Sequence, residues 1–348
     1  MTDAPLWSWQ HGSAGGPPLE CEPVRYDDIQ GWDDDDHSEA FSLPASGARA
    51  GLPHNLNRDE ARAYIEANFA PFRIRDTTPG LLTAYYEPKL RGSRQFGSRF
   101  SIPVYARPPE LAPLPADATS LQQAGLTAGV WTTDGWVPYL TRREIEQGAL
   151  AGRGLEILYL DDVLDAYLMH VQGSALVHLE EGGSVRLAFD GKNGHPYTSI
   201  GKLLIALGLL DASHATLDRL LDVLRSDLDR AQTFLHENKS YIFFREREAT
   251  AAGPTGSSGA TLIAGRSLAI DPRYHAFGSL IWVNAPELTW DGAPFARLAV
   301  AQDTGSAIIG PQRGDLFCGT GAAVQQVAGA VRHRADFVLL RPRGESVP

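Results

Sequence analysis

Short apolar runs separated by polar or Gly-rich segments recur along this chain. Such runs, bounded by turn residues, predict β-strands. They lie at residues 81–86, 100–105, 185–189 and 241–244, and further strands are expected near 262–270, 279–284, 297–302 and 337–341. Short strands joined by Gly-rich turns, with few helices between them, favour a mainly β fold that contains a small barrel.

Helical periodicity is found at fewer places. Residues 57–69 predict a helix that Asn57 caps together with Glu60, with Ala61 and Ile65 on one face. Further helices are predicted at 162–171, 199–207, 216–224 and 322–330, and a capping box opens a short one at 141–144. Residues 251–259, rich in Gly, Ala and Ser, are expected to form a linker or loop.

Length and charge limit the classes of protein that the chain can belong to. A chain of 348 residues suggests two domains, or one domain with a large insertion. The net charge of −11 argues against nucleic acid as a partner and gives no support for binding to anionic lipid. The acidic run 33–36 is interpreted as a solvated loop in preference to a cation site.

The cysteines and the N-terminus carry little functional signal. Cys21 and Cys318 belong to no CxxC or CxxH pair, so we expect no structural zinc site. Cys318 is predicted to be a small apolar wall residue, with a nucleophile or a disulfide to Cys21 as the alternatives. We find no run of about 18 apolar residues, no signal peptide and no lipoprotein-type cysteine.

Three aspartates lie in or beside segments that follow short apolar runs, one of which is residues 298–301. Asp303 and Asp315 lie in a Gly-rich segment, residues 302–317, that cannot be a regular helix, and Asp271 follows the run 266–270. Acids just past buried strands lie where a cleft would form. Partial desolvation there raises a carboxyl pKa enough for general-acid work.

These residues resemble the 3D domain, named for its three aspartates, of the MltA family of lytic murein transglycosylases. The middle of the chain resembles the same family independently. The matching motifs are TAYYEP at 83–88, QGS at 172–174 and GKNGHPYTSIGK at 191–202. The resemblance covers about 83–340, whereas the first 50 or so residues carry no matching motif.

The resemblance implies a two-domain fold. Residues 1–89 and 248–348 would form a double-psi β-barrel, and residues 90–247 an inserted β-rich, barrel-like domain. A groove between the two would suit a polymeric glycan better than a small metabolite.

The resemblance also implies the chemistry. The family's catalytic aspartate falls on Asp315, which would protonate the bond between N-acetylmuramic acid and N-acetylglucosamine and then act as base. The muramyl C6 hydroxyl would close on C1 to give a 1,6-anhydro end, without cofactor or metal. Asp303 would be a supporting catalytic acid and Asp271 a less certain supporting residue. For both, the alternative is a turn-capping role.

Substrate contacts are expected from polar groups beside aromatic faces. Tyr85 and Tyr86 point to opposite sides of a strand, so at most one should meet substrate. Glu87 is expected at the surface, the alternative being the second carboxylate of a hydrolase pair. The expected substrate-binding residues are Thr83, Tyr85, Gln172, Gly173, Ser174, Asn193 and Tyr197, although Asn193 and Tyr197 fit a purely structural loop equally well.

Two other functions stay open: a conventional two-carboxylate glycan hydrolase, and a non-catalytic wall-binding module. In each case the partner is the glycan strand of peptidoglycan, and cell-wall synthases are a further partner class. The resemblance implies a periplasmic or outer-membrane location. Since the chain shows no signal peptide or lipid-attachment site, membrane association is expected only if an anchor was removed from it.

Overall fold

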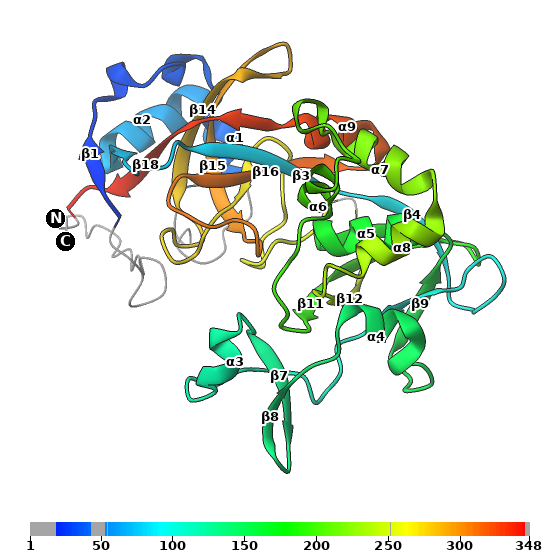
Figure 1. Ribbon diagram of the computed structural model, residues 1–348. Coiled ribbons are helices and arrows are strands. Elements are labelled where there is room, and N and C mark those ends of the chain that lie inside the picture. Colours follow the sequence, from blue (N-terminus) through cyan, green and yellow to red (C-terminus); the bar gives the residue numbers. More distant parts are fainter. Residues whose placement is uncertain (1–18, 43–52, 54, 251, 345–348) are drawn as a thin grey trace. The chain divides into compact units, whose positions relative to one another are not determined.

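The computed structural model describes residues 19–42, 53, 55–250 and 252–344 (Figure 1). The chain divides into two compact units. The first contains residues 1–86, 255–319 and 330–348, and the second contains 87–254 and 320–329. The chain therefore leaves the first unit after Tyr86, returns at Thr255, and visits the second unit once more over ten residues near the C-terminus.

The first unit is built on a nine-stranded sheet. Two helices, α1 (Ser38–Phe41) and α2 (Arg58–Asn68), belong to the same unit. In spatial order the strands are β1 (Cys21–Pro23), β2 (Phe69–Ile74), β18 (Asp336–Pro342), β14 (Leu280–Trp290), β15 (Ala293–Asp303), β13 (Ser267–Ala269), β16 (Arg313–Thr320), β3 (Leu81–Glu87) and β17 (Arg332–Arg334).

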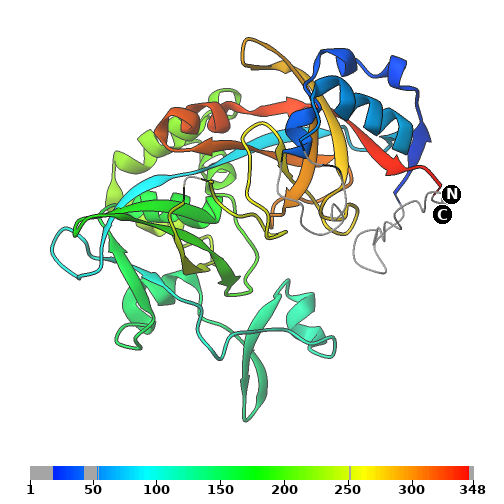
Figure 2. The same ribbon diagram turned by 180° about the vertical axis from the view of Figure 1, so that it is seen from behind.

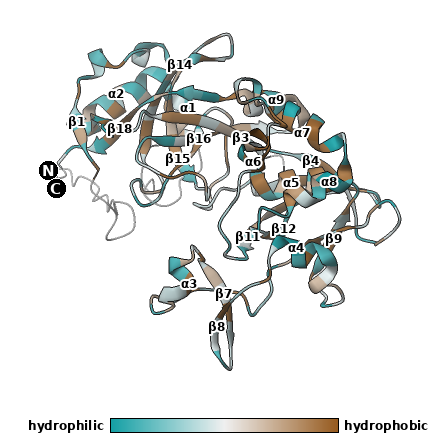
Figure 3. Cartoon of the chain, viewed as in Figure 1, coloured by the Kyte–Doolittle hydropathy of each residue, from teal (hydrophilic) through white to brown (hydrophobic). Residues whose placement is uncertain are grey.

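The central strands of this sheet are buried on both faces. On β14, Ile281 and Val283 join one core cluster, whereas Leu280 and Trp282 join a second cluster with residues of α1 and α2. Alternate residues of a strand point to opposite faces, so two cores require an almost continuous apolar run. The helices differ from these strands, because they carry both hydrophilic and hydrophobic residues (Figure 3).

Helix α2 begins as its sequence predicts. The Asn57 side chain accepts from the Glu60 amide at 3.0 Å, and the Glu60 carboxylate accepts from the Asn57 amide at 3.0 Å. This reciprocal capping box satisfies two amides that would otherwise have no helical partner. Ala61 and Ile65 are fully buried, as predicted.

The acidic run 33–36 is not wholly solvated, which corrects the prediction for it. Asp35 is 6% exposed, and its carboxylate receives two hydrogen bonds of 2.7 Å from the guanidinium of Arg266. The Leu298 amide donates a third, at 2.9 Å. Arg266 is itself 1% exposed, and a buried cation requires a buried partner.

The second unit contains two sheets and most of the helices. The six-stranded sheet has the order β12 (Ile242–Glu248), β11 (Ser184–Lys192), β10 (Ser174–Leu179), β4 (Lys89–Ser93), β9 (Glu156–Leu160) and β5 (Ile102–Tyr105). The three-stranded sheet joins β6 (Ala112–Pro113), β7 (Ala128–Thr132) and β8 (Gly135–Pro138). The helices are α3 (Thr119–Gln123), α4 (Arg142–Glu144), α5 (Val163–Gln172), α6 (Ile200–Ala206), α7 (Leu217–Arg225), α8 (Leu228–Leu235) and α9 (Ala322–Ala330), of which Ala330 falls in the first unit.

Helix α5 connects the two parts of this unit's core. Ala166 and Met169 pack with the six-stranded sheet, whereas Leu164, Tyr167 and Leu168 pack with helices α6 to α8. Figure 2 shows these elements from behind. The C-terminal end of α5 passes directly into β10 through Gly173, whose φ of 83° is in the left-handed region that favours glycine.

The mainly β prediction is confirmed, as are the predicted helices at 57–69, 162–171, 199–207, 216–224 and 322–330. The pattern missed the helices α1, α3 and α8, the three-stranded sheet, and the strands β1, β2, β4, β9, β10, β16 and β17. Within the described part of the chain, every helix is too short or too polar to span a membrane.

Candidate active site

Asp315 lies on β16, in the first unit. It pairs with Ala269 of β13, and the next three residues, Leu316, Phe317 and Cys318, are all at most 3% exposed. The preceding residue is Gly314, where a Cβ atom would lie 2.9 Å from side-chain atoms of Leu268 and Phe337. The absence of a side chain therefore lets this strand enter the apolar core, and its acid is half-buried as a result.

Asp315 is held by a residue of β3. The Thr83 hydroxyl donates to Oδ1 of Asp315, and Nη2 of Arg313 donates to the Thr83 oxygen at 2.7 Å. Arg313 precedes Asp315 by two positions, so both side chains leave the same face of β16. Arg313 also donates through Nη1 to the carbonyl oxygens of Gly314 and Leu81.

Burial raises the pKa of Asp315 above the ordinary aspartate value, and the charge of Asp303 raises it further. The Thr83 hydrogen bond and the Arg313 charge oppose this shift without cancelling it. Desolvation dominates because the ionised form loses water on the apolar side of the strand. Asp315 is therefore suited to carry a proton at a higher pH than a solvated aspartate.

Asp303, at the end of β15, accepts four hydrogen bonds. Tyr85 donates through its hydroxyl at 2.9 Å, Ser257 through its amide at 2.9 Å and its hydroxyl at 2.7 Å, and Thr304 through its amide at 2.9 Å. Burial, together with the charge of Asp303, raises the pKa of Tyr85 well above its usual value. Tyr85 thus stays a hydroxyl donor, and the orientation of Asp303 is fixed from several sides.

Asp271 organises a turn. It is 2% exposed and accepts from the Gly310 amide at 2.8 Å and from Nη2 of Arg273 at 2.6 Å. Burial raises the pKa of Asp271, but these hydrogen bonds and the Arg273 charge outweigh it, so the net shift is downward. His275 adds a contact of 2.7 Å to the Pro311 carbonyl. These contacts tie the turn to the loop between β15 and β16, in line with the capping alternative.

Gln172, Gly173 and Ser174 belong to the second unit. They form the junction of α5 and β10, and all three are partly exposed. Ser174 pairs with Ala188 of β11. All three residues are therefore partly accessible to solvent.

Asn193 and Tyr197 differ in accessibility. Asn193 is 0% exposed. Its side-chain Nδ2 donates at 2.8 Å to the carbonyls of Leu140 and Lys239, and its Oδ1 accepts from the backbone amide of Tyr241 at 2.9 Å. These bonds make Asn193 part of the loop framework, the alternative left open by its sequence. Tyr197 is 38% exposed and remains accessible.

Glu87 is buried, so its predicted surface position is wrong. It is 0% exposed and bonds Arg186 through Nε at 2.7 Å and Nη2 at 3.2 Å. Thr320 donates a further hydrogen bond of 2.8 Å. The charge of Glu87 is thus neutralised within the second unit. Its neighbour Tyr86 is 1% exposed, which confirms that one tyrosine of the pair is a core residue.

Cys318 occupies an apolar wall, as predicted. It is 3% exposed, and burial with the nearby charge of Asp315 raises the pKa of its thiol to about 12. A thiol with such a pKa is a poor nucleophile at neutral pH. Cys21 and Cys318 are both free, so the alternative of a disulfide between them is wrong.

The sequence pattern missed two residues of this site, Arg313 and Ser257. The position of Arg313 two residues before Asp315 was the available signal, because alternate residues share a strand face. Ser257 lies in the Gly- and Ser-rich segment that was interpreted as a linker, and only its contact with Asp303 reveals its role.

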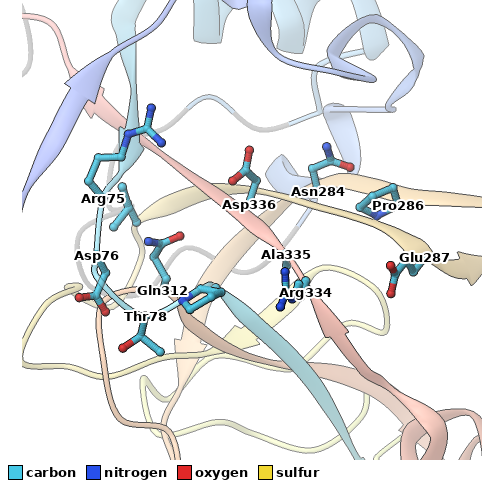
Figure 4. A pocket seen from close by; sticks show the side chains of 13 residues that line it. Arg75, Asp76, Thr78, Asn284, Pro286, Glu287, Gln312, Arg334, Ala335 and Asp336 are labelled. Atoms are coloured by element: carbon cyan, nitrogen blue, oxygen red, sulfur yellow. The ribbon is translucent and has the colours of Figure 1, made fainter.

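A separate pocket of about 400 Å³ lies elsewhere in the first unit (Figure 4). Its lining mixes both charges, with Arg75 and Arg334 beside Asp76, Glu287 and Asp336. None of the three aspartates considered above lines it. Across the described residues, no group of three or more His, Cys, Asp or Glu side chains is placed to hold a metal ion.

Two known domain families match parts of this chain. Residues 81–245 match the MltA specific insert domain, and residues 266–341 match the 3D domain. The crystal structure of a membrane-bound lytic murein transglycosylase from Agrobacterium tumefaciens is 34% identical, covers 93% of this chain and 98% of its own, and superposes with a TM-score of 0.82. MltA from Neisseria gonorrhoeae is 26% identical, with 97% and 94% coverage and a TM-score of 0.74.

A relative of known name shows the same family similarity. The membrane-bound lytic murein transglycosylase A of Vibrio cholerae is 34% identical over 259 residues, or 73% of this chain. The match spans 63% of the Vibrio protein's length, slightly less than two thirds.

Proposed function

The chain belongs to the MltA family of lytic murein transglycosylases, and from this premise we propose that it cleaves the β-1,4 bond between N-acetylmuramic acid and N-acetylglucosamine in peptidoglycan, releasing 1,6-anhydromuramoyl products. One observation carries the proposal: Asp315 is half-buried, its pKa is raised, and one of its oxygens is held by Thr83. The substrate implies action in the periplasm or at the outer membrane.

Asp315 serves first as acid and then as base. Its proton passes to the glycosidic oxygen as that oxygen leaves C1, which gains oxocarbenium character. The resulting carboxylate takes the proton of the muramyl C6 hydroxyl, and the C6 oxygen closes on C1. The carboxylic acid is thereby regenerated and no water is consumed.

The supporting groups would stabilise charge at the reacting sugar and bind the glycan. Asp303, fixed by four donors, would stabilise positive charge at the reacting sugar. Thr83, Tyr85, Gln172, Ser174 and Tyr197 would contact hydroxyl, acetamide or C–H faces of the glycan, and Gly173 would supply backbone groups.

Digestion of purified murein sacculi tests the proposal, with mass analysis of the soluble products. The native protein should release anhydromuropeptides. Asp315→Asn should lower the rate by about 10²–10⁴-fold, the usual contribution of a general acid. The matched control is Asp291→Asn, the same chemical change at an exposed turn of the first unit, where φ is 50° and Asn is well tolerated.

The products separate the alternatives. Fragments one water heavier than the anhydro species would identify a conventional two-carboxylate hydrolase. No product from the native protein, with retained binding to sacculi, would identify a wall-binding module. Equal loss of activity in Asp315→Asn and Asp291→Asn would refute the role assigned to Asp315.

A further inference from the structure

Arg313, Thr83 and Asp315 form a chain of hydrogen bonds within the first unit. Nη2 of Arg313 donates to the Thr83 oxygen at 2.7 Å, and the Thr83 hydroxyl donates to Oδ1 of Asp315. Arg313 is itself anchored by two carbonyl oxygens, those of Gly314 and Leu81. The guanidinium therefore has a fixed position from which it can act on Thr83.

The direction of this chain follows from the chemistry of its members. A guanidinium has five N–H donors and no acceptor, so the Thr83 oxygen must accept from Arg313. A threonine hydroxyl has one proton, and the remaining partner of Thr83 is Oδ1 of Asp315. An ionised Asp315 can only accept, so Thr83 then donates to Oδ1, and the hydrogen bond from Arg313 favours the same direction when Asp315 is protonated.

We infer that Arg313 is a positioning residue that acts through Thr83 to keep the proton of Asp315 on Oδ2. In a protonated carboxyl the carbonyl oxygen is the stronger acceptor, so a hydrogen bond from Thr83 to Oδ1 favours the proton on Oδ2. This inference rests on the proposed function: the Oδ2–H bond breaks as the glycosidic oxygen gains the proton, and Oδ2 later regains a proton from the C6 hydroxyl. A single oxygen atom would serve both steps.

Arg313 also changes the charge around the acid. The groups that act electrostatically on Asp315 or Arg313 are Thr83, Asp303 and Arg332, and Asp315 in turn acts on Tyr85 and Cys318. Both Arg313 and Thr83 lower the pKa of Asp315 against the larger effect of burial. Removing either one should therefore raise the pKa of Asp315.

Two variants test the inference, Arg313→Met and Thr83→Val. A general acid loses activity as pH rises through its pKa, so the alkaline limb of kcat/KM should move to higher pH in both variants. At low pH, where Asp315 is protonated in every variant, kcat should fall by about 10- to 100-fold because the proton is no longer held on Oδ2. The double variant should lose no more kcat there than Thr83→Val alone, since Arg313 acts through Thr83.

The controls separate this role from a general structural one. Thr83→Ser keeps the hydroxyl, so the alkaline limb of its kcat/KM profile should lie at the native pH and most of kcat should be retained. Arg25→Met removes a cation from an exposed site of the same unit and should change neither. The inference would be overturned if the alkaline limb of kcat/KM stayed at the native pH in Arg313→Met, or if the kcat losses were additive in the double variant.

A second readout does not depend on activity. Titration of the ¹³Cγ resonance of Asp315 should show a higher pKa in Arg313→Met and Thr83→Val than in the native protein. If the native protein released no anhydro product, the proposed function would fail, yet this titration would still decide whether Arg313 and Thr83 control the acid. An unchanged Asp315 titration in both variants would refute that control.

Discussion

At the scale of single residues, the buried charges in the described part of the chain are paired rather than isolated. Asp35 lies against Arg266, and Glu87 lies against Arg186. Transferring an unpaired ion from water into an apolar interior costs several kcal/mol, so each partner is required once the other is buried. Asp315 departs from this pattern, because its direct partner is the neutral hydroxyl of Thr83. That difference lets burial raise its pKa.

Glu87→Leu should destabilise the second unit by about 3–5 kcal/mol, the usual cost of breaking a buried ion pair, because Arg186 would keep its charge without its carboxylate. Urea unfolding followed by circular dichroism measures the change. The double variant Glu87→Leu/Arg186→Met, which removes both charges, should recover much of the loss. A single variant as stable as the native protein would show that the ion pair contributes nothing.

At the scale of elements, local signals were sufficient where an element is defined by its own residues. Asn57 with Glu60, and Thr141 with Glu144, predicted helix starts because a capping box is formed within four residues. Strand β16 was missed because Gly314 weakens its pattern, and its partners β13 and β3 are distant in the chain. Apolar runs in the sequence singled out the acids and the family resemblance gave their roles, whereas Arg313 and Ser257 required contacts between distant segments.

Asn57→Ala should destabilise helix α2 by about 1 kcal/mol, because the Glu60 amide would lose its acceptor. Chemical denaturation of the purified protein gives this difference. Asn57→Asp retains the acceptor oxygen and should stay close to the native stability. If Asn57→Asp lost as much stability as Asn57→Ala, the effect would not come from the cap.

At the scale of the whole molecule, one buried histidine connects stability to pH. His37 is 0% exposed, and its ring lies 4.2 Å from that of Trp32 and 6.0 Å from that of Trp282. Neither ring nitrogen has a hydrogen-bond partner among the described residues. Burial lowers the pKa of His37 to about 4, while the charge of Asp35 opposes this shift and that of Arg266 adds to it.

The stability of the protein should fall as pH drops from about 6.5 toward 4. In this window the unfolded chain binds a proton at residue 37 and the folded one does not, so acid favours unfolding. The loss from His37 should reach about 3 kcal/mol near pH 4. His37→Phe keeps an aromatic ring without titration, and its unfolding free energy between pH 5 and 6.5 should depend less on pH. An identical dependence in both proteins would exclude His37 as the cause.

Strand β3 has a consequence for the insertion and deletion of codons. The side chains of Thr83, Tyr85 and Glu87 form hydrogen bonds with Asp315, Asp303 and Arg186, respectively. Residues 83 and 85 belong to one compact unit, and residue 87 belongs to the other. A one-codon insertion between 83 and 87 would reverse the side of the strand on which the later residues point. An inserted or deleted codon within 83–87 should therefore abolish activity, whereas one beyond Glu87 would leave these three side chains on the strand face from which they make their contacts.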